Sequence, residues 1–493
     1  MTELPFPHPV YARTVLEPLF EGVKLHHTDD LSAINCAHLV MLGEAGILTR
    51  DQTRAIARAL RAIEDETDVT SLRYTGEHED YFFLVEAELK RRLDDLGGML
   101  HTARSRNDMD HTIFRRALIR RGQGLFAQVR ALALALIAKA EAERATLIVA
   151  YTHGQPAQPT TFGHYLAAAI EVLLRDATRI DAALDQLEYC PMGACAITTS
   201  GFPIDRARMA GLLGFREPTL NSYGSIASVD YITALYSAIR LTFLHLGRLV
   251  QDLAFWSAFE VGQLRVPDSL VQISSIMPQK RNPVPIEHLR HLCSVTAGRC
   301  EMVVGTMHNT PFTDMNDSEG AVQEAGYAAF DSGGRALDLL AAFLPACAID
   351  AARVAVNTDA ACITITELAD TLVRDDGLSF RQAHEIAART ARAAIAARKP
   401  LRDAHAAFAE AFSAETGRAP RMAEPDFRST VAPETFVARR DRPGGPAPAA
   451  LAAAFASYRH ALHDLDAASD LRNCRGADAQ AALDAAFADL LED

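Results

Sequence analysis

The sequence predicts an all-α protein built around a bundle of long helices. Ala, Leu, Arg and Glu dominate the chain, and the alternation of β-branched and polar residues that marks strands is scarce. With 493 residues, of which 49% are hydrophobic and 23% charged, the chain can bury a large core. Its length alone suggests two or three domains.

Five long helical patterns follow one another in the middle of the chain. The first would be on the order of 60 Å long at the standard helical rise, which is too long to bury its apolar stripe inside a small monomer. A bundle shared between subunits would cover that stripe. The five patterns occupy residues 108–150, 162–188, 228–260, 285–308 and 320–343.

Shorter helical patterns flank this bundle on both sides. Residues 1–103 contain short helices broken at Gly76 and at Gly97-Gly98, which predicts a small N-terminal helical domain. Residues 104–349 form the predicted central bundle domain, which carries the chemical motifs. Residues 350–493 form a smaller C-terminal helical domain.

Charge and composition argue against a nucleic-acid-binding protein, a membrane-spanning protein and a zinc protein. The formal net charge of -14 argues against general binding to nucleic acid or anionic membranes, and no nucleic-acid recognition module is present. The apolar run at residues 125–150 is broken by charges, which excludes a membrane span, and the first residues lack an export signal. The eight cysteines show no zinc spacing and no C-x-x-C pair. We expect a cytoplasmic protein with reduced thiols and no metal site.

The most informative segment is residues 274–283, SSIMPQKRNP, a loop bounded by prolines. Ser274 and Ser275 offer hydroxyl and backbone N–H groups, Lys280 a point positive charge, and Asn282 amide donors. Together these groups suit a substrate that carries carboxylates. An isolated serine pair would be read as a simple turn, but the whole string favours chemistry.

A second segment, residues 101–108 with the sequence HTARSRND, opens the first long helix. In the plainest interpretation Asp108 or Asn107 caps that helix. A helix N-terminus also presents free N–H groups and the positive end of the helix dipole. Ser105, Arg106 and Asn107 would then form a cradle for a carboxylate.

The third segment, residues 151–159, has the sequence YTHGQPAQP. A lone histidine before a turn is more often structural than catalytic. Here Thr152, Gln155 and Gln158 crowd hydroxyl and amide groups around His153. His153 becomes a candidate proton donor or acceptor if another group orients its ring.

Taken together, these segments resemble the argininosuccinate lyase branch of the fumarase/aspartase superfamily. A serine-rich loop ending in Met-Pro-Gln-Lys-x-Asn-Pro is specific for the superfamily, and HTxRSRND is specific for the branch. The resemblance implies an all-α, three-domain fold and a homotetramer whose central helices form a 20-helix core, with active sites assembled from three subunits. Further agreement lies at residues 191–206, 380–386 and 444–448, so the resemblance spans nearly the whole chain.

The resemblance also implies a reversible elimination without a cofactor, in which a succinyl C–N bond breaks to give fumarate and an amine. Abstracting a proton beside a carboxylate builds a doubly charged intermediate, so the site must concentrate positive charge and N–H donors. By resemblance, the catalytic groups are Ser274 as base, His153 for proton transfer, Glu287 as its carboxylate partner, and Lys280. The substrate-binding groups are Ser105, Arg106, Asn107, Thr152, Gln155, Ser275, Met277 and Asn282, and no metal is implied.

The sequence departs from the family where argininosuccinate lyases hold the arginine part of their substrate. Val229 stands in place of an arginine, and Phe82 in place of a histidine. Residues 312–319 lack the family's tyrosine, glutamine and lysine, and residues 20–23 lack its serine. The positions that would bind the fumarate part of the substrate keep the residues typical of the family.

Three functions are compatible with these residues to different degrees. The departures favour a C–N lyase acting on an N-substituted aspartate whose amine is not arginine. Such an enzyme is similar to ethylenediamine-N,N'-disuccinate lyase and would cleave aminopolycarboxylates such as ethylenediaminedisuccinate. The alternative is an argininosuccinate lyase, which gives arginine and fumarate. A non-catalytic structural homologue is disfavoured, because Ser274, His153, Lys280 and Asn282 are all present.

Overall fold

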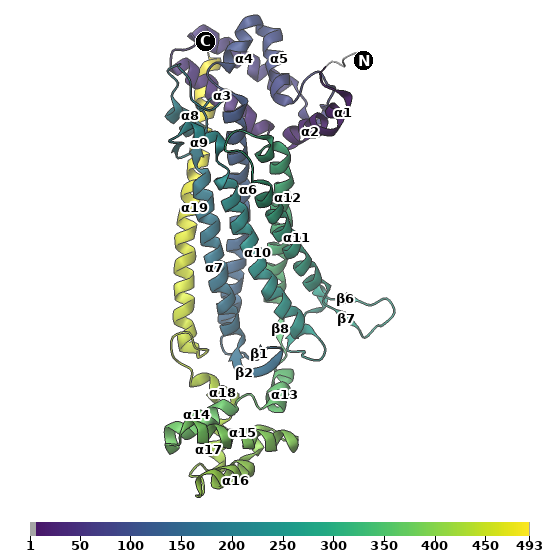
Figure 1. Ribbon diagram of the computed structural model, residues 1–493, viewed down its shortest axis with the longest axis vertical. Helices are drawn as coiled ribbons and strands as arrows, with labels where there is room; N and C mark the ends of the chain where they lie inside the picture. The colour runs from purple at the N-terminus through teal and green to yellow at the C-terminus, as the bar shows by residue number, and fades with distance from the viewer. Residues whose placement is uncertain (1–5, 493) are drawn as a thin grey trace.

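The structure, a computed structural model, describes residues 6–492 and is elongated and almost entirely helical (Figure 1). A bundle of long helices runs along the molecule. N-terminal helices gather at one end of this bundle, and a group of short C-terminal helices lies at the other. The predicted all-α fold is therefore confirmed.

All five predicted central helices are present. Their apolar residues recur every three or four positions and meet in one large core that contains Leu136, Ile170, Leu235, Leu289 and Leu337. The helices are α6 (Arg106–Ala142), α7 (Phe162–Leu187), α10 (Asp230–Ser257), α11 (Val284–Thr306) and α12 (Gly320–Ala346).

The first of these helices is shorter than predicted, because it ends at Ala142 rather than at residue 150. The next residues form an antiparallel hairpin of β1 (Leu147–Thr152) and β2 (Gln155–Thr161). Proline at positions 156 and 159 is incompatible with a helix interior, and the Leu-Ile-Val run of β1 suits a strand. With its 37 residues, α6 still spans about 55 Å.

The start of α6 also differs from the expectation. Neither Asp108 nor Asn107 is the N-cap; Ser105 occupies that position, and its Oγ accepts the backbone N–H of Asn107 at 3.4 Å. The Asp108 carboxylate closes a capping box by accepting the N–H of Ser105 at 2.9 Å. Its second oxygen accepts the N–H groups of Gly193 and Cys195, each at 2.9 Å. Asp108 therefore ties the start of α6 to the loop at residues 191–205.

The N-terminal region packs around its own apolar core, which includes Leu39, Ile56, Leu60 and Leu89. Its helices are α1 (Pro9–Tyr11), α2 (Glu17–His26), α3 (Thr28–Glu44), α4 (Arg50–Glu66) and α5 (Tyr81–Leu93). A π-helical turn (Ala12–Leu16) and 3-10 turns (Val69–Ser71, Asp94–His101) join them, and α8 (Arg206–Leu212) and α9 (Ser222–Ala227) lie at the same end.

The C-terminal region forms a further cluster around Leu368, Leu372, Ile386, Phe408 and Phe427. Its helices are α13 (Ala351–Ala361), α14 (Ile365–Asp376), α15 (Phe380–Ala396), α16 (His405–Thr416), α17 (Glu424–Thr430) and α18 (Pro433–Ala438). The predicted division into domains at residues 103 and 349 stays a prediction.

The last helix, α19 (Pro448–Leu491), runs back along α7 from the C-terminal cluster to the N-terminal helices (Figure 1). Its Phe455 and Leu462 belong to the bundle core, whereas Leu483 and Phe487 belong to the N-terminal core. Its 44 residues span about 66 Å. One helix thus contacts two separate hydrophobic cores.

Short paired strands complete the connections. β3 (Tyr189–Cys190) pairs in parallel with β4 (Glu217–Pro218), and β5 (Leu264–Arg265) pairs antiparallel with β8 (Ala348–Ile349). β6 (Gln272–Ile273) and β7 (Arg281–Asn282) form a hairpin. Within residues 6–492, no helix has both the length and the apolar character needed to cross a membrane.

Replacing Gly163 by alanine is expected to destabilise the fold by about 1–3 kcal/mol. A Cβ at this position near the start of α7 would lie 2.4 Å from the Ala140 carbonyl oxygen and 2.7 Å from the Arg144 Cα, and backbone atoms cannot move aside as a side chain can. Thermal unfolding followed by circular dichroism measures the effect. The matched control is Gly476→Ala in α19, where a Cβ meets no atom within 4 Å and should be neutral or slightly stabilising. Equal melting temperatures for the two variants would contradict the packing argument.

Candidate active site

The predicted carboxylate cradle lies at the N-terminus of α6, where Ser105, Arg106 and Asn107 are held by the capping box. The Arg106 guanidinium is engaged by two carboxylates. Its Nη1 lies 2.7 Å from Asp80 Oδ2 and its Nη2 3.2 Å from Asp110 Oδ2. The ring of Phe82 stacks beneath the same group, with its centroid 4.8 Å from Arg106 Cζ.

His153 lies at the tip of the β1–β2 hairpin, at the other end of α6 (Figure 1). Both turn residues, His153 and Gly154, have positive φ, of 54° and 72°, which suits a two-residue turn of the primed type. The side chains of Thr152, His153 and Gln155 are exposed. Gln263 fixes the base of the hairpin, because its buried amide accepts the N–H of Val149 at 3.1 Å and donates to the carbonyl of the same residue at 3.2 Å.

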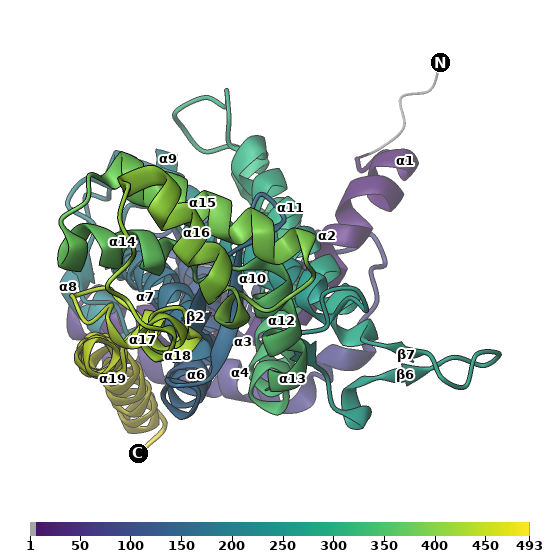
Figure 2. The ribbon, with the colours of Figure 1, turned by 90° about the horizontal axis from the view of Figure 1, so that it is seen from below.

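Ser274 begins the loop between β6 and β7, which projects away from the bundle (Figure 2). Its Oγ accepts the backbone N–H of Met277 at 3.1 Å and that of Ile276 at 3.4 Å. The loop is closed by the N–H of Lys280, which donates to the Met277 carbonyl at 3.0 Å. Backbone N–H groups therefore point at the oxygen that is predicted to act as the base.

The remaining residues of this segment lie around that loop. The side chains of Ser275, Met277 and Lys280 are exposed, and Asn282 is half-buried on β7. Glu287 is exposed in the first turn of α11. Its predicted partnership with His153 stays a prediction.

A single chain does not bring the three predicted motifs together. The cradle lies at one end of α6 and the His153 hairpin follows the other end, so about 55 Å of helix separates them. Elements at the same end of the bundle as His153 also include β8 and the β6–β7 hairpin, as Figure 1 shows. The structure thus places the predicted residues in separate groups.

Sequence reasoning missed an acidic cavity of about 530 Å³ beside Arg106. Burial raises the pKa of Glu324 to about 7. Burial, together with Asp110 and Asp314, raises the pKa of Glu319 to about 8. The signal for it in the sequence is the segment at residues 312–319, where acidic residues occur while the family's tyrosine, glutamine and lysine are missing. The acidic residues that line this cavity are Glu79, Asp80, Asp110, Glu319 and Glu324.

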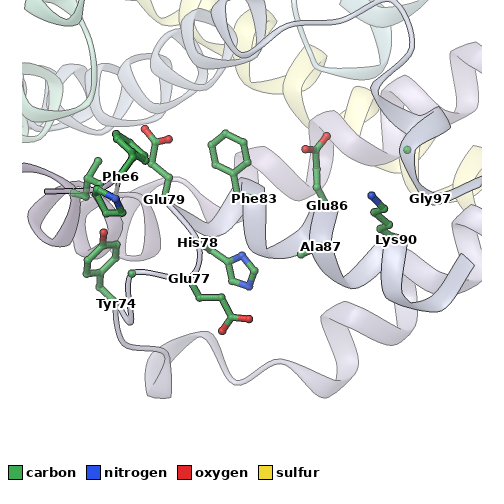
Figure 3. A pocket seen from close by; sticks show the side chains of 14 residues that line it. Phe6, Tyr74, Glu77, His78, Glu79, Phe83, Glu86, Ala87, Lys90 and Gly97 are labelled. Atoms are coloured by element: carbon green, nitrogen blue, oxygen red, sulfur yellow. The ribbon is translucent and has the colours of Figure 1, made fainter. Parts of the chain in front are cut away.

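A second cavity of about 530 Å³ lies among the N-terminal helices (Figure 3). Phe83, Glu86 and Lys90 face it from successive turns of α5, and Tyr74 and His78 line it from the preceding connection. It contains none of the predicted site residues. Of these two cavities, the acidic one is connected to the predicted chemistry, through Arg106.

Comparisons with known proteins cover almost the whole chain. The lyase family matches residues 9–298, and the argininosuccinate lyase C-terminal family matches residues 362–438. Argininosuccinate lyase 2 of Agrobacterium fabrum (strain C58) is 59% identical over 94% of this chain and 92% of its own. Argininosuccinate lyase of Chelativorans sp. (strain BNC1) is 35% identical over 72% of this chain and 74% of its own. A crystal structure of EDDS lyase in complex with formate superposes with a TM-score of 0.83, at 27% identity, over 98% of this chain and 96% of that one.

These comparisons correct the substrate expectation. Changed residues on the amine side had favoured an aminopolycarboxylate lyase whose amine is not arginine. That expectation is wrong, because the relative that is 59% identical over nearly the full length is an argininosuccinate lyase, and the C-terminal region matches the same family. The enzyme class is unaffected by this correction. The chain belongs to the argininosuccinate lyase branch of the fumarase/aspartase superfamily and is a carbon–nitrogen lyase that releases fumarate.

Proposed function

We propose that this protein cleaves argininosuccinate reversibly to arginine and fumarate. The observation that carries the proposal is the 59% identity to argininosuccinate lyase 2 over 94% of the chain. The site must remove a proton beside a carboxylate and stabilise the charge that develops there. The groups predicted from the sequence provide both functions.

Ser274 is the proposed base. A serine hydroxyl is a poor base unless its alkoxide is stabilised, and the N–H groups of Ile276 and Met277 already point at its oxygen. Lys280 in the same loop adds positive charge. The proton leaves the substrate carbon for Ser274, and the electron pair of the broken C–N bond goes to the guanidino nitrogen, so that fumarate and arginine result.

The other proposed residues bind and orient the substrate. Ser105, Arg106 and Asn107 would hold a succinyl carboxylate at the N-terminus of α6. Ser275, Met277 and Asn282 would surround the substrate from the serine loop, and Thr152 and Gln155 from the hairpin. His153 would move protons, with Glu287 as its orienting carboxylate.

A homotetramer is part of this proposal, because separate copies must supply the separated motifs. The length of α6 supports it: neither end of a helix of about 55 Å can bend back to meet the other. An antiparallel arrangement of copies would place the cradle of one chain beside the loops of others. We also propose a cytoplasmic location, for which the eight unpaired cysteines are the support.

Purified enzyme is expected to release fumarate from argininosuccinate, followed by the ultraviolet absorbance of fumarate. In the reverse direction, fumarate should be consumed with arginine and not with ethylenediamine. Chromatography of the products identifies argininosuccinate. Consumption of fumarate with ethylenediamine but not with arginine would overturn the proposed substrate.

A further inference from the structure

The acidic cavity beside Arg106 holds more carboxyl groups than its own cation can pair with. Arg106 is the single arginine or lysine among the described residues that line it, and its guanidinium is shared between Asp80 and Asp110. Glu319 and Glu324 line the same cavity without a cation of their own among those lining residues. A cationic ligand would supply the missing partner and allow these carboxyl groups to ionise.

Glu319, which lines this cavity, forms a carboxyl pair with the neighbouring Asp314. Glu319 directly precedes α12, and its side chain is within hydrogen-bonding reach of Asp314. Two carboxyl groups at such a distance repel each other when both are ionised, so they hold a proton until a cation replaces it. Asp110 faces the pair from α6.

His111 provides an independent indication that the pair needs a further partner. Its side chain is fully buried, and its Nδ1 lies 3.1 Å from the Tyr231 hydroxyl. Its Nε2 has no hydrogen-bond partner and lies 3.7 Å from Asp314 Oδ1, which is likewise buried and unpartnered. Buried polar atoms left without a partner are costly, so this arrangement indicates a ligand that engages Asp314 or Glu319.

The position of the cluster on α6 indicates which part of the substrate lies there. Ser105 and Asn107 begin the helix, where a succinyl carboxylate would bind, and Asp110 follows Arg106 by one turn on the same face. In argininosuccinate the guanidino nitrogen is bonded directly to the succinyl carbon. A guanidinium group next to the bound carboxylate would therefore meet Asp110 and the carboxyl pair, whose oxygens match its planar set of N–H donors.

We propose that Asp110, Asp314 and Glu319 form the subsite that binds the guanidinium of the substrate. The subsite rests on the proposed cleavage of argininosuccinate and explains how the amine part is held where the family's usual side chains are replaced. Binding of the cation displaces the proton shared by Glu319 and Asp314. The groups that face Glu319 in this exchange are Asp110, Asp314 and Arg106, with Tyr231 close by.

The first test compares Glu319→Gln with wild type in the reverse reaction. We expect KM for arginine to rise by roughly tenfold to hundredfold, the range for a lost hydrogen bond to a charged group, while KM for fumarate stays unchanged. Asp314→Asn should behave in the same way. The matched control is Asp317→Asn, which removes the same charge from an exposed neighbouring side chain. Equal arginine KM values for Glu319→Gln and the control would overturn the subsite.

The second test does not depend on turnover. Calorimetric titration of wild type with methylguanidinium at pH 7.5, in two buffers that differ in ionisation heat, should show proton release, because the cation lowers a pKa that lies near 8 in the free protein. Glu319→Gln should lose that release. Release in wild type and its loss in the variant support the subsite even if argininosuccinate proves not to be the substrate. Absence of methylguanidinium binding, or binding without proton release, overturns the subsite even if argininosuccinate is cleaved.

Discussion

Replacing Ser274 by alanine is expected to lower kcat by about 10²- to 10⁴-fold, the contribution of a positioned general base. The hydroxyl lies in a projecting loop and accepts backbone N–H groups, so its loss removes the base without opening a cavity in a core. Fumarate release measures kcat, and circular dichroism should show unchanged helicity.

Ser269→Ala is the matched control for this experiment. Ser269 is exposed in the 3-10 turn that precedes the same hairpin and makes none of the loop's contacts to Ser274. Its kcat should equal that of wild type. If Ser274→Ala also kept wild-type kcat, the base would have to be another residue.

Two inactive variants are expected to regain activity when their subunits are mixed. Arg106→Gln lacks the cradle arginine, and Ser274→Ala lacks the base. Within one chain, the elements that carry these two residues lie at opposite ends of the bundle and do not meet. In mixed tetramers, a site that takes each motif from a different copy has both motifs intact with a probability of about one half times one half. Up to about a quarter of wild-type activity should therefore return. Co-expression with two purification tags isolates the mixed oligomers.

The control pairs Ser274→Ala with Lys280→Ala. Both residues belong to the loop between β6 and β7, so every site receives this loop with one of the two substitutions. Mixing these variants should restore nothing. Equal recovery in both mixtures, or recovery in neither, would contradict a site shared between copies.

Local sequence patterns predict the helices whose bounds are set by the spacing of their own apolar residues. The apolar spacing of α7 gave its start at residue 162 and its end to within one residue. The end of α6 was missed, because a Leu-Ile-Val run continues an apolar pattern equally well as helix or strand until its pairing with β2 is known. The cap was missed because Ser105, Asn107 and Asp108 are all good capping residues, and backbone geometry selects among them.

The acidic cluster could not be predicted from the sequence for a different reason. Asp110 and Glu319 are far apart in the chain and meet only because α6 packs against α12 and the segment before it. The missing family residues indicate an amine other than arginine only if no other segment of the chain supplies groups that bind arginine. The wrong substrate expectation follows from that assumption.

The long C-terminal helix α19 has a consequence for unfolding. Its first half packs in the bundle, and its last turns pack among the N-terminal helices. Unfolding of either core therefore removes apolar contacts from the same helix. Cooperativity spreads through such shared elements. The bundle and the N-terminal helices should therefore lose hydrogen-exchange protection together, as one cooperative unit that a break in the backbone within α19 would divide in two.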